Sequence, residues 1–205
     1  MPLEKEDSIP KDSIPHWTTT AKKVIAANPF LTLEEHHRKE EGTGKEADFF
    51  IMHAPNWANI IAITEEGEIV LIEQFRQGSD RIELEIPGGI VGEDENPADA
   101  ILRELTEETG YQRTAQSIFK KIGEVIPNPA FMRNKCYTYL VTKVRLSAPT
   151  QFDEHENIKV RLVPRAEIER LIRNSEIQHS LVIDAFYWMT LEQSSGLKNL
   201  DSGSV

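Results

Sequence analysis

The chain has 205 residues, of which 39% are hydrophobic and 28% are charged, an ordinary globular composition long enough for one large domain with a small annex. Lys and Arg number 23 against 34 Asp and Glu, so the formal net charge is −11. This acidic balance disfavours binding to a nucleic-acid backbone, which needs clustered basic residues. If the substrate is an anion, it needs help from a cation.

The N-terminal segment and the cysteine content predict a cytoplasmic protein. The opening residues, MPLEKEDSIPKDSIP, lack the apolar stretch of a signal peptide. No apolar run approaches the roughly 18 residues that indicate a membrane span. The single cysteine, Cys136, cannot form an internal disulfide, and we expect it to be half-buried on a strand.

Residues 1–55 are expected to form a polar tail followed by a small strand-rich region. Strand-like runs at 22–27, 30–38 and 48–53 are separated by turn signals. A few strands alone bury little surface, so this region is expected to pack on something else, and a partner subunit is one candidate. The histidines at 36 and 37 stand in no metal-ligand spacing and are expected on the strand surface.

Residues 56–196 are expected to form the main domain, and 197–205 a loose tail. A helix is well signalled from Pro97, because Asn96 can cap it and Gly110 suits its end. Strands mixed with helices, without regular alternation, predict a mixed sheet flanked by helices. The other predicted strands are 58–64, 68–76, 81–86, 117–126, 134–146 and 157–163. A short helix is predicted over 164–173, followed by an amphipathic one carrying Ile177, Leu181, Val182, Ala185, Phe186 and Met189 on one side.

The helix from Pro97 gathers like charges on one face. At 100° per residue, Glu104, Glu107 and Glu108 lie beside the arc that faces the core, so they are expected to be partly desolvated. Arg103 can pair with Glu107, but one guanidinium cannot balance three carboxylates. A solvated acidic face is the alternative; a hard divalent cation with oxygen ligands would balance the charge. The core arc comprises Ala98, Ile101, Leu102, Leu105 and Thr109.

The spacing of the whole stretch resembles the signature of the Nudix hydrolases, G-x5-E-x7-R-E-U-x-E-E-x-G-U, in which U is a bulky aliphatic residue. Only the last position departs from it, where Tyr111 replaces the aliphatic residue. The flanking strands resemble the family over about Trp57 to Gln193. The resemblance implies the Nudix fold, an α+β architecture with a mixed sheet in an α/β/α sandwich. The matching residues are Gly89, Glu95, Arg103, Glu104, Leu105, Glu107, Glu108 and Gly110.

The resemblance also implies roles for the residues of the signature. Glu104 and Glu108 would be the principal ligands of Mg²⁺, for which Mn²⁺ can substitute, and Glu107 would join directly or through water. The carbonyl of Gly88 would be a further ligand. Arg103 and Glu95 would orient the carboxylates from behind, a role compatible with a structural salt bridge.

Features outside the signature resemble the ADP-ribose pyrophosphatase branch of the family. Pro127 lies at the position where that branch carries a proline, although it can simply end a strand. The EQFR run makes Arg76 a candidate phosphate ligand, with an exposed edge-strand arginine as the alternative. The ELEIPGG run makes Glu85 a candidate near the sugar or the metal cluster.

The strand-rich N-terminus resembles the dimerisation region of that branch, which implies a homodimer in which Trp17 or Phe30 could stack on a base. Simple packing is the alternative for both rings, and Trp57 is expected in the core. The segment FDEHENIKV stands where the branch carries a mobile acidic loop. Glu154 is therefore the first candidate for the general base, Glu156 the second and His155 the third.

The predicted function is Mg²⁺-dependent hydrolysis of the pyrophosphate bond of ADP-ribose or a nucleoside diphosphate sugar. Glu154, Glu156 and Arg103 form the expected catalytic set, and neither a membrane nor a nucleic acid is expected as a partner. Two alternatives stay open. One is a Nudix hydrolase acting on nucleoside triphosphates or capped RNA, and the other is a non-catalytic nucleotide-sugar sensor on the same scaffold.

Overall fold

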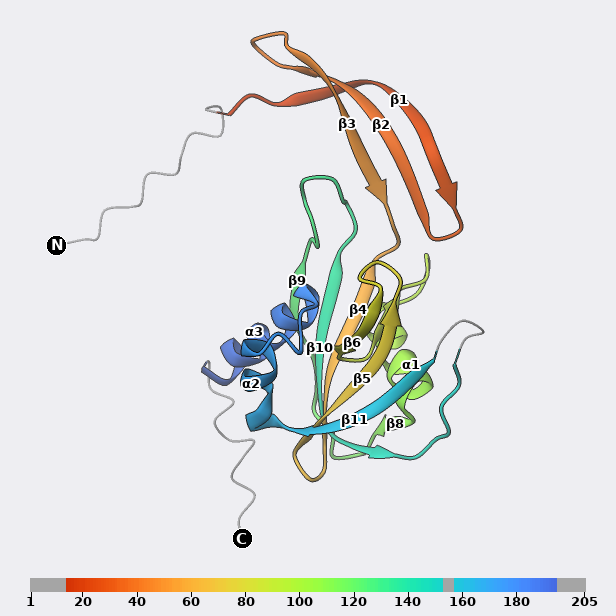
Figure 1. The fold of residues 1–205 in the computed structure, drawn as a ribbon, viewed down its shortest axis with the longest axis vertical. Helices are drawn as coiled ribbons and strands as arrows, with labels where there is room; N and C mark the ends of the chain where they lie inside the picture. Colours follow the sequence, from red (N-terminus) through yellow and green to blue (C-terminus); the bar gives the residue numbers. More distant parts are fainter. Residues whose placement is uncertain (1–13, 153–156, 195–205) are drawn as a thin grey trace, which may run out of the picture. The chain divides into compact units, whose positions relative to one another are not determined.

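The computed structural model describes residues 14–152 and 157–194 (Figure 1). The chain divides into two compact units. The first runs to residue 54 and also includes residues 128–133, whereas the second comprises residues 55–127 and those from 134 onward. The sequence did not predict that residues 128–133 join the first unit.

The first unit is a three-stranded antiparallel sheet in the order β1-β2-β3. Its strands are β1 (Trp17–Asn28), β2 (Leu31–Glu40) and β3 (Glu46–His53). In the turn between β1 and β2 the Asn28 side chain accepts a hydrogen bond from the Phe30 N–H at 2.8 Å, a bond typical of asparagine in turns. Residues 128–133 join at β3, where the Met52 N–H donates to the Phe131 carbonyl at 2.7 Å.

Two burial predictions for strand residues are wrong. His36 was expected on the surface of its strand, but it is 0% exposed. Cys136 was expected to be half-buried, but it is 1% exposed, and burial raises the pKa of its thiol to about 12. Neighbouring strand residues face opposite sides of a sheet, and a local pattern does not say which side another element covers.

The second unit is built on a mixed sheet with β11-β5-β4-β10-β8 as its main order. β4 and β10 run parallel, and the other strand pairs are antiparallel. β6 extends the sheet beside β5, β7 pairs with β4, and β9 pairs with β10. The strands are β4 (Trp57–Thr64), β5 (Glu68–Arg76), β6 (Arg81–Glu85), β7 (Gly88–Ile90), β8 (Tyr111–Arg113), β9 (Phe119–Val125), β10 (Cys136–Leu146) and β11 (Ile158–Pro164).

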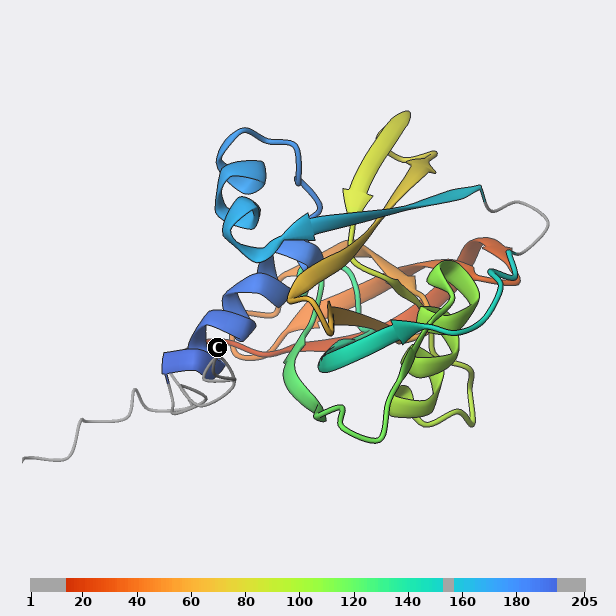
Figure 2. The ribbon, with the colours of Figure 1, turned by 90° about the horizontal axis from the view of Figure 1, so that it is seen from below.

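Helices cover both faces of this sheet (Figures 1 and 2). On β4, Ile61 packs in one core cluster with residues of α2 (Ile168–Arg173) and α3 (Ser180–Ser194). Its neighbours Ile60 and Ala62 pack in the other cluster with α1 (Pro97–Thr109). A 3-10 turn, Arg165–Glu167, precedes α2. The predicted mixed sheet in an α/β/α sandwich is confirmed.

The differences from the predicted elements lie in short segments and at ends. β7 and β8 have three residues each, too few to show a period, and were not predicted. The last helix begins at Ser180, three residues after Ile177, which is nevertheless 1% exposed.

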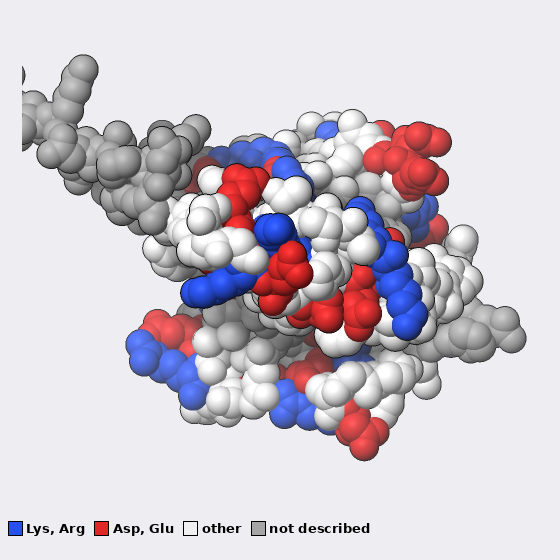
Figure 3. All heavy atoms as spheres, turned by 90° about the horizontal axis from the view of Figure 1, so that it is seen from above, with Lys and Arg blue, Asp and Glu red and all other residues white. Residues whose placement is uncertain are grey.

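No described helix is long and apolar enough to cross a membrane. On the face drawn in Figure 3, acidic and basic side chains are interspersed rather than gathered into one basic stripe.

Candidate active site

Local signals at both ends set the register of α1. The Asn96 side chain accepts a hydrogen bond from the Ala98 N–H at 2.9 Å, and Pro97 occupies the first turn, where its missing N–H costs nothing. Gly110 ends the helix with φ of 74°, and a Cβ at this position would overlap the Ala148 carbonyl oxygen. Glycine is required there both for its conformation and for space.

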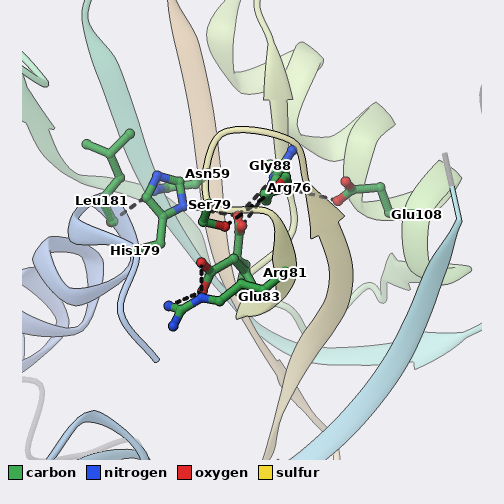
Figure 4. Close-up of polar contacts among 10 residues, drawn as sticks. Asn59, Arg76, Ser79, Arg81, Glu83, Gly88, Glu108, His179 and Leu181 are labelled. Carbon is green, nitrogen blue, oxygen red and sulfur yellow. Dashed lines mark hydrogen bonds and ion pairs between the residues drawn. The ribbon is translucent and has the colours of Figure 1, made fainter. Parts of the chain in front are cut away.

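One face of α1 carries a carboxylate into the core. Ile101 and Leu105 are 0% exposed, and Glu108, on the next turn, is only 2% exposed. The Gly88 N–H donates to Glu108 Oε2 at 3.0 Å (Figure 4). A hydrogen bond of this kind favours the ionised carboxylate. The helix therefore holds a buried carboxyl group against the turn that precedes β7.

The Glu104 carboxyl group lies against Gly89, the next residue of the same segment. A Cβ built on Gly89 would overlap the Glu104 carboxyl group, so any larger residue there would force that carboxyl group to move. The Glu104 side chain is 15% exposed. Glu104 and Glu108 thus both direct carboxylates at the Gly88–Gly89 backbone.

Arg103 ties the remaining carboxylates together. Its guanidinium contacts Glu95 at 3.1 Å, Glu104 at 2.9 Å and Glu107 at 2.9 Å. The bond to Glu95 is the main cause that raises the Arg103 pKa above its usual range. The Glu95 pKa is lowered, first by Arg103 and then by the Gly92 N–H. One positive charge is shared among three negative ones, so the cluster retains a capacity for further positive charge.

A cavity of about 1020 Å³ is lined in part by the Gly88–Gly89 segment. All of its lining residues belong to the second unit. They come from β4, from the β5–β6 hairpin, from β7, from Cys136 and from the start of α3 with the loop before it. Charged or polar residues that line it include Asn59, Arg76, Arg81, Glu83, Glu85 and His179.

Glu85 lies at the centre of one polar cluster in the cavity wall. It accepts two bonds from Arg76, at 2.8 and 2.9 Å, and its Oε2 lies 3.1 Å from His179 Nδ1. Burial raises the pKa of the Glu85 carboxyl, but the bonds from Arg76 and His179 outweigh burial and lower this pKa to about 2. Glu85 is therefore an anion that holds the Arg76 guanidinium at the cavity.

Two further polar groups line the cavity (Figure 4). Arg81 donates to Glu83 at 2.7 and 3.0 Å and also to Gln178, and the bond from Arg81 is the main cause that lowers the Glu83 pKa. The Asn59 side chain donates to the Leu181 carbonyl at 3.2 Å. Its Oδ1 is buried and finds no hydrogen-bond partner among the described residues.

Comparison with known proteins identifies the family. A model of the NUDIX domain matches residues 52–198, well over half of the chain. The chain belongs to the Nudix family. The Gly88–Gly89 segment and α1 therefore correspond to the Nudix signature that the sequence predicted.

Individual relatives match the chain over different lengths. The chain is 30% identical over 177 residues to an ADP-ribose pyrophosphatase of Bacillus subtilis (strain 168), covering 86% of this chain and 94% of the relative. It is 44% identical over 62 residues to a methanol dehydrogenase activator of Bacillus methanolicus, a match that covers 30% of this chain and 34% of the relative. A crystal structure of an ADP compounds hydrolase superposes with a TM-score of 0.76 at 18% identity, covering 88% of this chain and 95% of that one. At that identity the structural match shows the Nudix fold alone.

The structure brings most of the predicted Nudix site residues together. Glu104, Glu107, Arg103 and Glu95 form one contact network, and Glu108 bonds to Gly88. Arg76 and Glu85 line the adjoining cavity as an ion pair, in which the Arg76 side chain is 40% exposed. Glu154, His155 and Glu156 lie outside the described residues.

Other predicted residues lie elsewhere. Trp17 belongs to the first unit, where its ring packs edge-on against Phe49 with centroids 5.3 Å apart. Pro127 lies in the connection between β9 and β10. Trp57, expected in the core, is half-buried and lines the cavity.

Several cavity residues were missed from the sequence. Glu83 stands two residues before Glu85 on β6, so strand alternation could have found it. Asn59 and His179 carry no such local signal, because the tertiary fold alone brings β4 and the start of α3 to the same cavity.

Proposed function

We propose that this chain hydrolyses the pyrophosphate bond of ADP-ribose or another nucleoside diphosphate sugar, releasing a nucleoside monophosphate and a sugar phosphate. The observation that carries the proposal is the match to an ADP-ribose pyrophosphatase across 86% of this chain and 94% of that relative. The cavity of about 1020 Å³ supports it, since pockets of roughly 300–1,000 Å³ bury drug-sized ligands.

The residues of α1 fit a hard divalent cation. Glu104, Glu107 and Glu108 supply carboxylate oxygens, the donors that Mg²⁺ takes together with substrate phosphate. Arg103 is shared among Glu95, Glu104 and Glu107, and Glu108 adds a further carboxylate at the Gly88–Gly89 segment, an excess that a cation would neutralise. Glu104 and Glu108 would hold Mg²⁺, with Mn²⁺ as a substitute, and Glu107 and the Gly88 carbonyl would complete the set. When bound, the cation supplies positive charge to the diphosphate and makes water more acidic.

The chain's own residues bind and orient the substrate. Arg76 and Arg81 place guanidinium groups at the cavity wall, where they would meet the diphosphate, and Glu85 and Glu83 hold them in position. Arg103 keeps the carboxylates of α1 in place.

Hydrolysis also requires a base. Glu154 would take the proton from the attacking water, with Glu156 as the second candidate, and Arg103 belongs to the catalytic set as an orienting residue. The water oxygen bonds to one phosphorus, and the bridging P–O bond breaks. We take the location of the protein as cytoplasmic, and we expect no nucleic-acid partner because of its net charge of −11.

The first unit is proposed to form a homodimer. Val24, Ile25, Phe30, Phe49 and Phe50 are 39–65% exposed on a sheet of only three strands. Exposed apolar surface of this kind is typical of protein contacts. Phe30, which is 65% exposed, is better placed to stack on a base than Trp17, whose ring packs on Phe49. Light scattering tests the dimer, and a monomer mass would exclude it.

The activity is tested by incubating the protein with Mg²⁺ and, separately, ADP-ribose, ADP-glucose, GDP-mannose and a nucleoside triphosphate. Chromatography of the products should show a monophosphate from one or more diphosphate sugars. Cleavage of the triphosphate alone would move the protein to another substrate class. Binding of a sugar nucleotide in calorimetry without any turnover would favour a sensor.

A further inference from the structure

Three potential metal ligands lie together on the sheet of the first unit, apart from the residues of the Nudix signature. Glu34 and His36 stand two residues apart on β2, so they share one face of the sheet. His53, on β3, pairs in register with Thr32, which is also on that face. The β2–β3 register therefore places His53 opposite Thr32, next to Glu34 on the same face.

The three side chains converge on one oxygen atom. Glu34 Oε2 lies 2.7 Å from His36 Nε2 and 2.9 Å from His53 Nε2. The ligand atoms all lie within 4.8 Å of one another. The bond to His36 is also the main cause that lowers the pKa of Glu34 below its usual range.

We propose that Glu34, His36 and His53 form a second metal site, which takes a transition-metal dication of the Zn²⁺ class. Two imidazole nitrogens and one carboxylate oxygen form a donor set that Zn²⁺ accepts and Mg²⁺ does not prefer. Ligands at about 2.0–2.1 Å from a tetrahedral ion stand about 3.3 Å apart. The observed separations of 2.7 and 2.9 Å need to open by only a few tenths of an ångström as the ion replaces the shared protons.

Exposure leaves the site open on one side. The side chains of His53 and Glu34 are 35% and 20% exposed, whereas that of His36 is 0% exposed. An ion can therefore enter past His53, and water can fill the fourth position. The site resembles a three-ligand zinc site with an open position more than a closed structural one.

Two neighbouring groups limit the affinity. His36 Nδ1 is buried and has no hydrogen-bond partner among the described residues, and such a partner typically contributes 10- to 100-fold to metal affinity. Lys22 pairs with His36 across β1 and β2, and its positive charge acts on Glu34. We therefore expect weaker binding than at a fully supported zinc site. Bound metal would link β2 to β3 and stabilise the first unit by mass action.

The test titrates the chelator-treated full-length chain with Co²⁺, a spectroscopic substitute for Zn²⁺, in the presence of excess Mg²⁺ to occupy the Nudix carboxylates. The wild type should bind one Co²⁺, develop the visible absorption of a tetrahedral nitrogen- and oxygen-ligated ion, and lose that absorption when Zn²⁺ is added. His53→Gln should weaken binding at least 10-fold. His53 is partly exposed, so this change spares the buried His36.

His37→Gln is the matched control, because His37 is adjacent on β2 but pairs with Asp48 at 2.7 Å on the opposite face. It should bind Co²⁺ as the wild type does. Glu108→Gln should also leave the Co²⁺ spectrum unchanged, which separates this site from the Nudix residues. The proposal is overturned if the wild type develops no such absorption, or if His53→Gln binds Co²⁺ as tightly as the wild type.

Discussion

Two groups of ionised side chains, one on α1 and one on β6, use carboxylates in opposite ways. On β6 each carboxylate has its own guanidinium, because Arg76 pairs with Glu85 and Arg81 pairs with Glu83. On α1 a single guanidinium, that of Arg103, contacts three carboxylates.

The difference indicates what each group is built for. In the pairs Arg76–Glu85 and Arg81–Glu83, one guanidinium neutralises one carboxylate, and each ion pair holds its side chains in place at the cavity wall. A surplus of carboxylates is held at a cost to the folded protein, since like charges in a partly buried setting repel. Such a surplus is useful only if a cation compensates it. Neutralising one carboxylate should therefore have opposite effects on stability in the two groups.

The largest effect is expected from Glu108→Gln. The glutamine oxygen can still accept the Gly88 N–H, so the fold should persist while one ligand charge is lost. Because a bound cation contributes several kcal/mol of charge stabilisation, turnover of ADP-ribose should fall by about 100-fold or more. Steady-state kinetics at saturating Mg²⁺ measures this loss.

Stability supplies the second readout for this variant. In the metal-free protein, Glu108→Gln should unfold at a temperature no lower than the wild type, because it relieves repulsion. Glu93→Gln, which removes the same charge from an exposed loop residue, is the control and should change neither property. Near-normal turnover in Glu108→Gln would remove Glu108 from the proposed ligand set.

Gly89→Ala should cost about as much activity without removing any charge. The added methyl group would overlap the Glu104 carboxyl and displace it from the Gly88–Gly89 segment. A misplacement of about 1 Å in a catalytic arrangement can reduce the rate about 100-fold. Kinetics together with a thermal unfolding curve separates displacement from misfolding, and unchanged kinetics would mean that the Glu104 position does not matter.

Arg103→Lys tests the shared guanidinium. Lysine keeps the positive charge but loses the planar fork that reaches Glu95, Glu104 and Glu107 together. Residues that orient metal ligands typically contribute 10- to 100-fold to affinity or activity. The Mg²⁺ concentration for half-maximal rate should rise by that factor, whereas an unchanged Mg²⁺ dependence would assign Arg103 a purely structural role.

Glu85→Gln should have the smallest effect on the rate of chemistry but should lower stability, by about 1–3 kcal/mol, because it removes the charge of Glu85 from its ion pair with Arg76. The pKa of Glu85 falls from 4.5 to about 2 on folding. A carboxyl whose pKa is lowered by folding stabilises fully above its unfolded pKa, and this contribution is lost as pH falls through the folded value.

Denaturant unfolding across a pH series checks this prediction. The difference in unfolding free energy between the wild type and Glu85→Gln should be constant above about pH 4.5 and should shrink between that pH and about pH 2. A difference that stays the same through this range would show that the ion pair with Arg76 does not set the Glu85 pKa.

The α1 cluster was predictable because its determinants are local. Asn96, Pro97 and Gly110 bound the helix, and the spacing of the glutamates along it then sets which of them face the core. The two ion pairs at the cavity wall could be predicted only in part. Arg76 and Glu85 were singled out by the EQFR and ELEIPGG runs. The alternation of β6 could have added Glu83 and placed Arg81 on the same face, but the pairing of Arg76 with Glu85 depends on the register of β5 with β6.

The rest depends on contacts between distant segments. Asn59 and His179 meet the same cavity only because the start of α3 lies against β4. His36 and His53 come together only through the register of β2 with β3. Alternation along one strand gives a face to each residue, but it does not reveal which strand or helix will cover that face.

We propose that the carboxylates of α1 hold the cation on which hydrolysis depends. The most direct test follows the release of AMP from ADP-ribose by chelator-treated protein as Mg²⁺ is restored, in the wild type and in Glu104→Gln. The wild type should show no hydrolysis without metal and a saturable rise with Mg²⁺, whereas Glu104→Gln should require far more Mg²⁺ for a much lower rate. Hydrolysis without metal, or identical Mg²⁺ curves for the two proteins, would contradict the account.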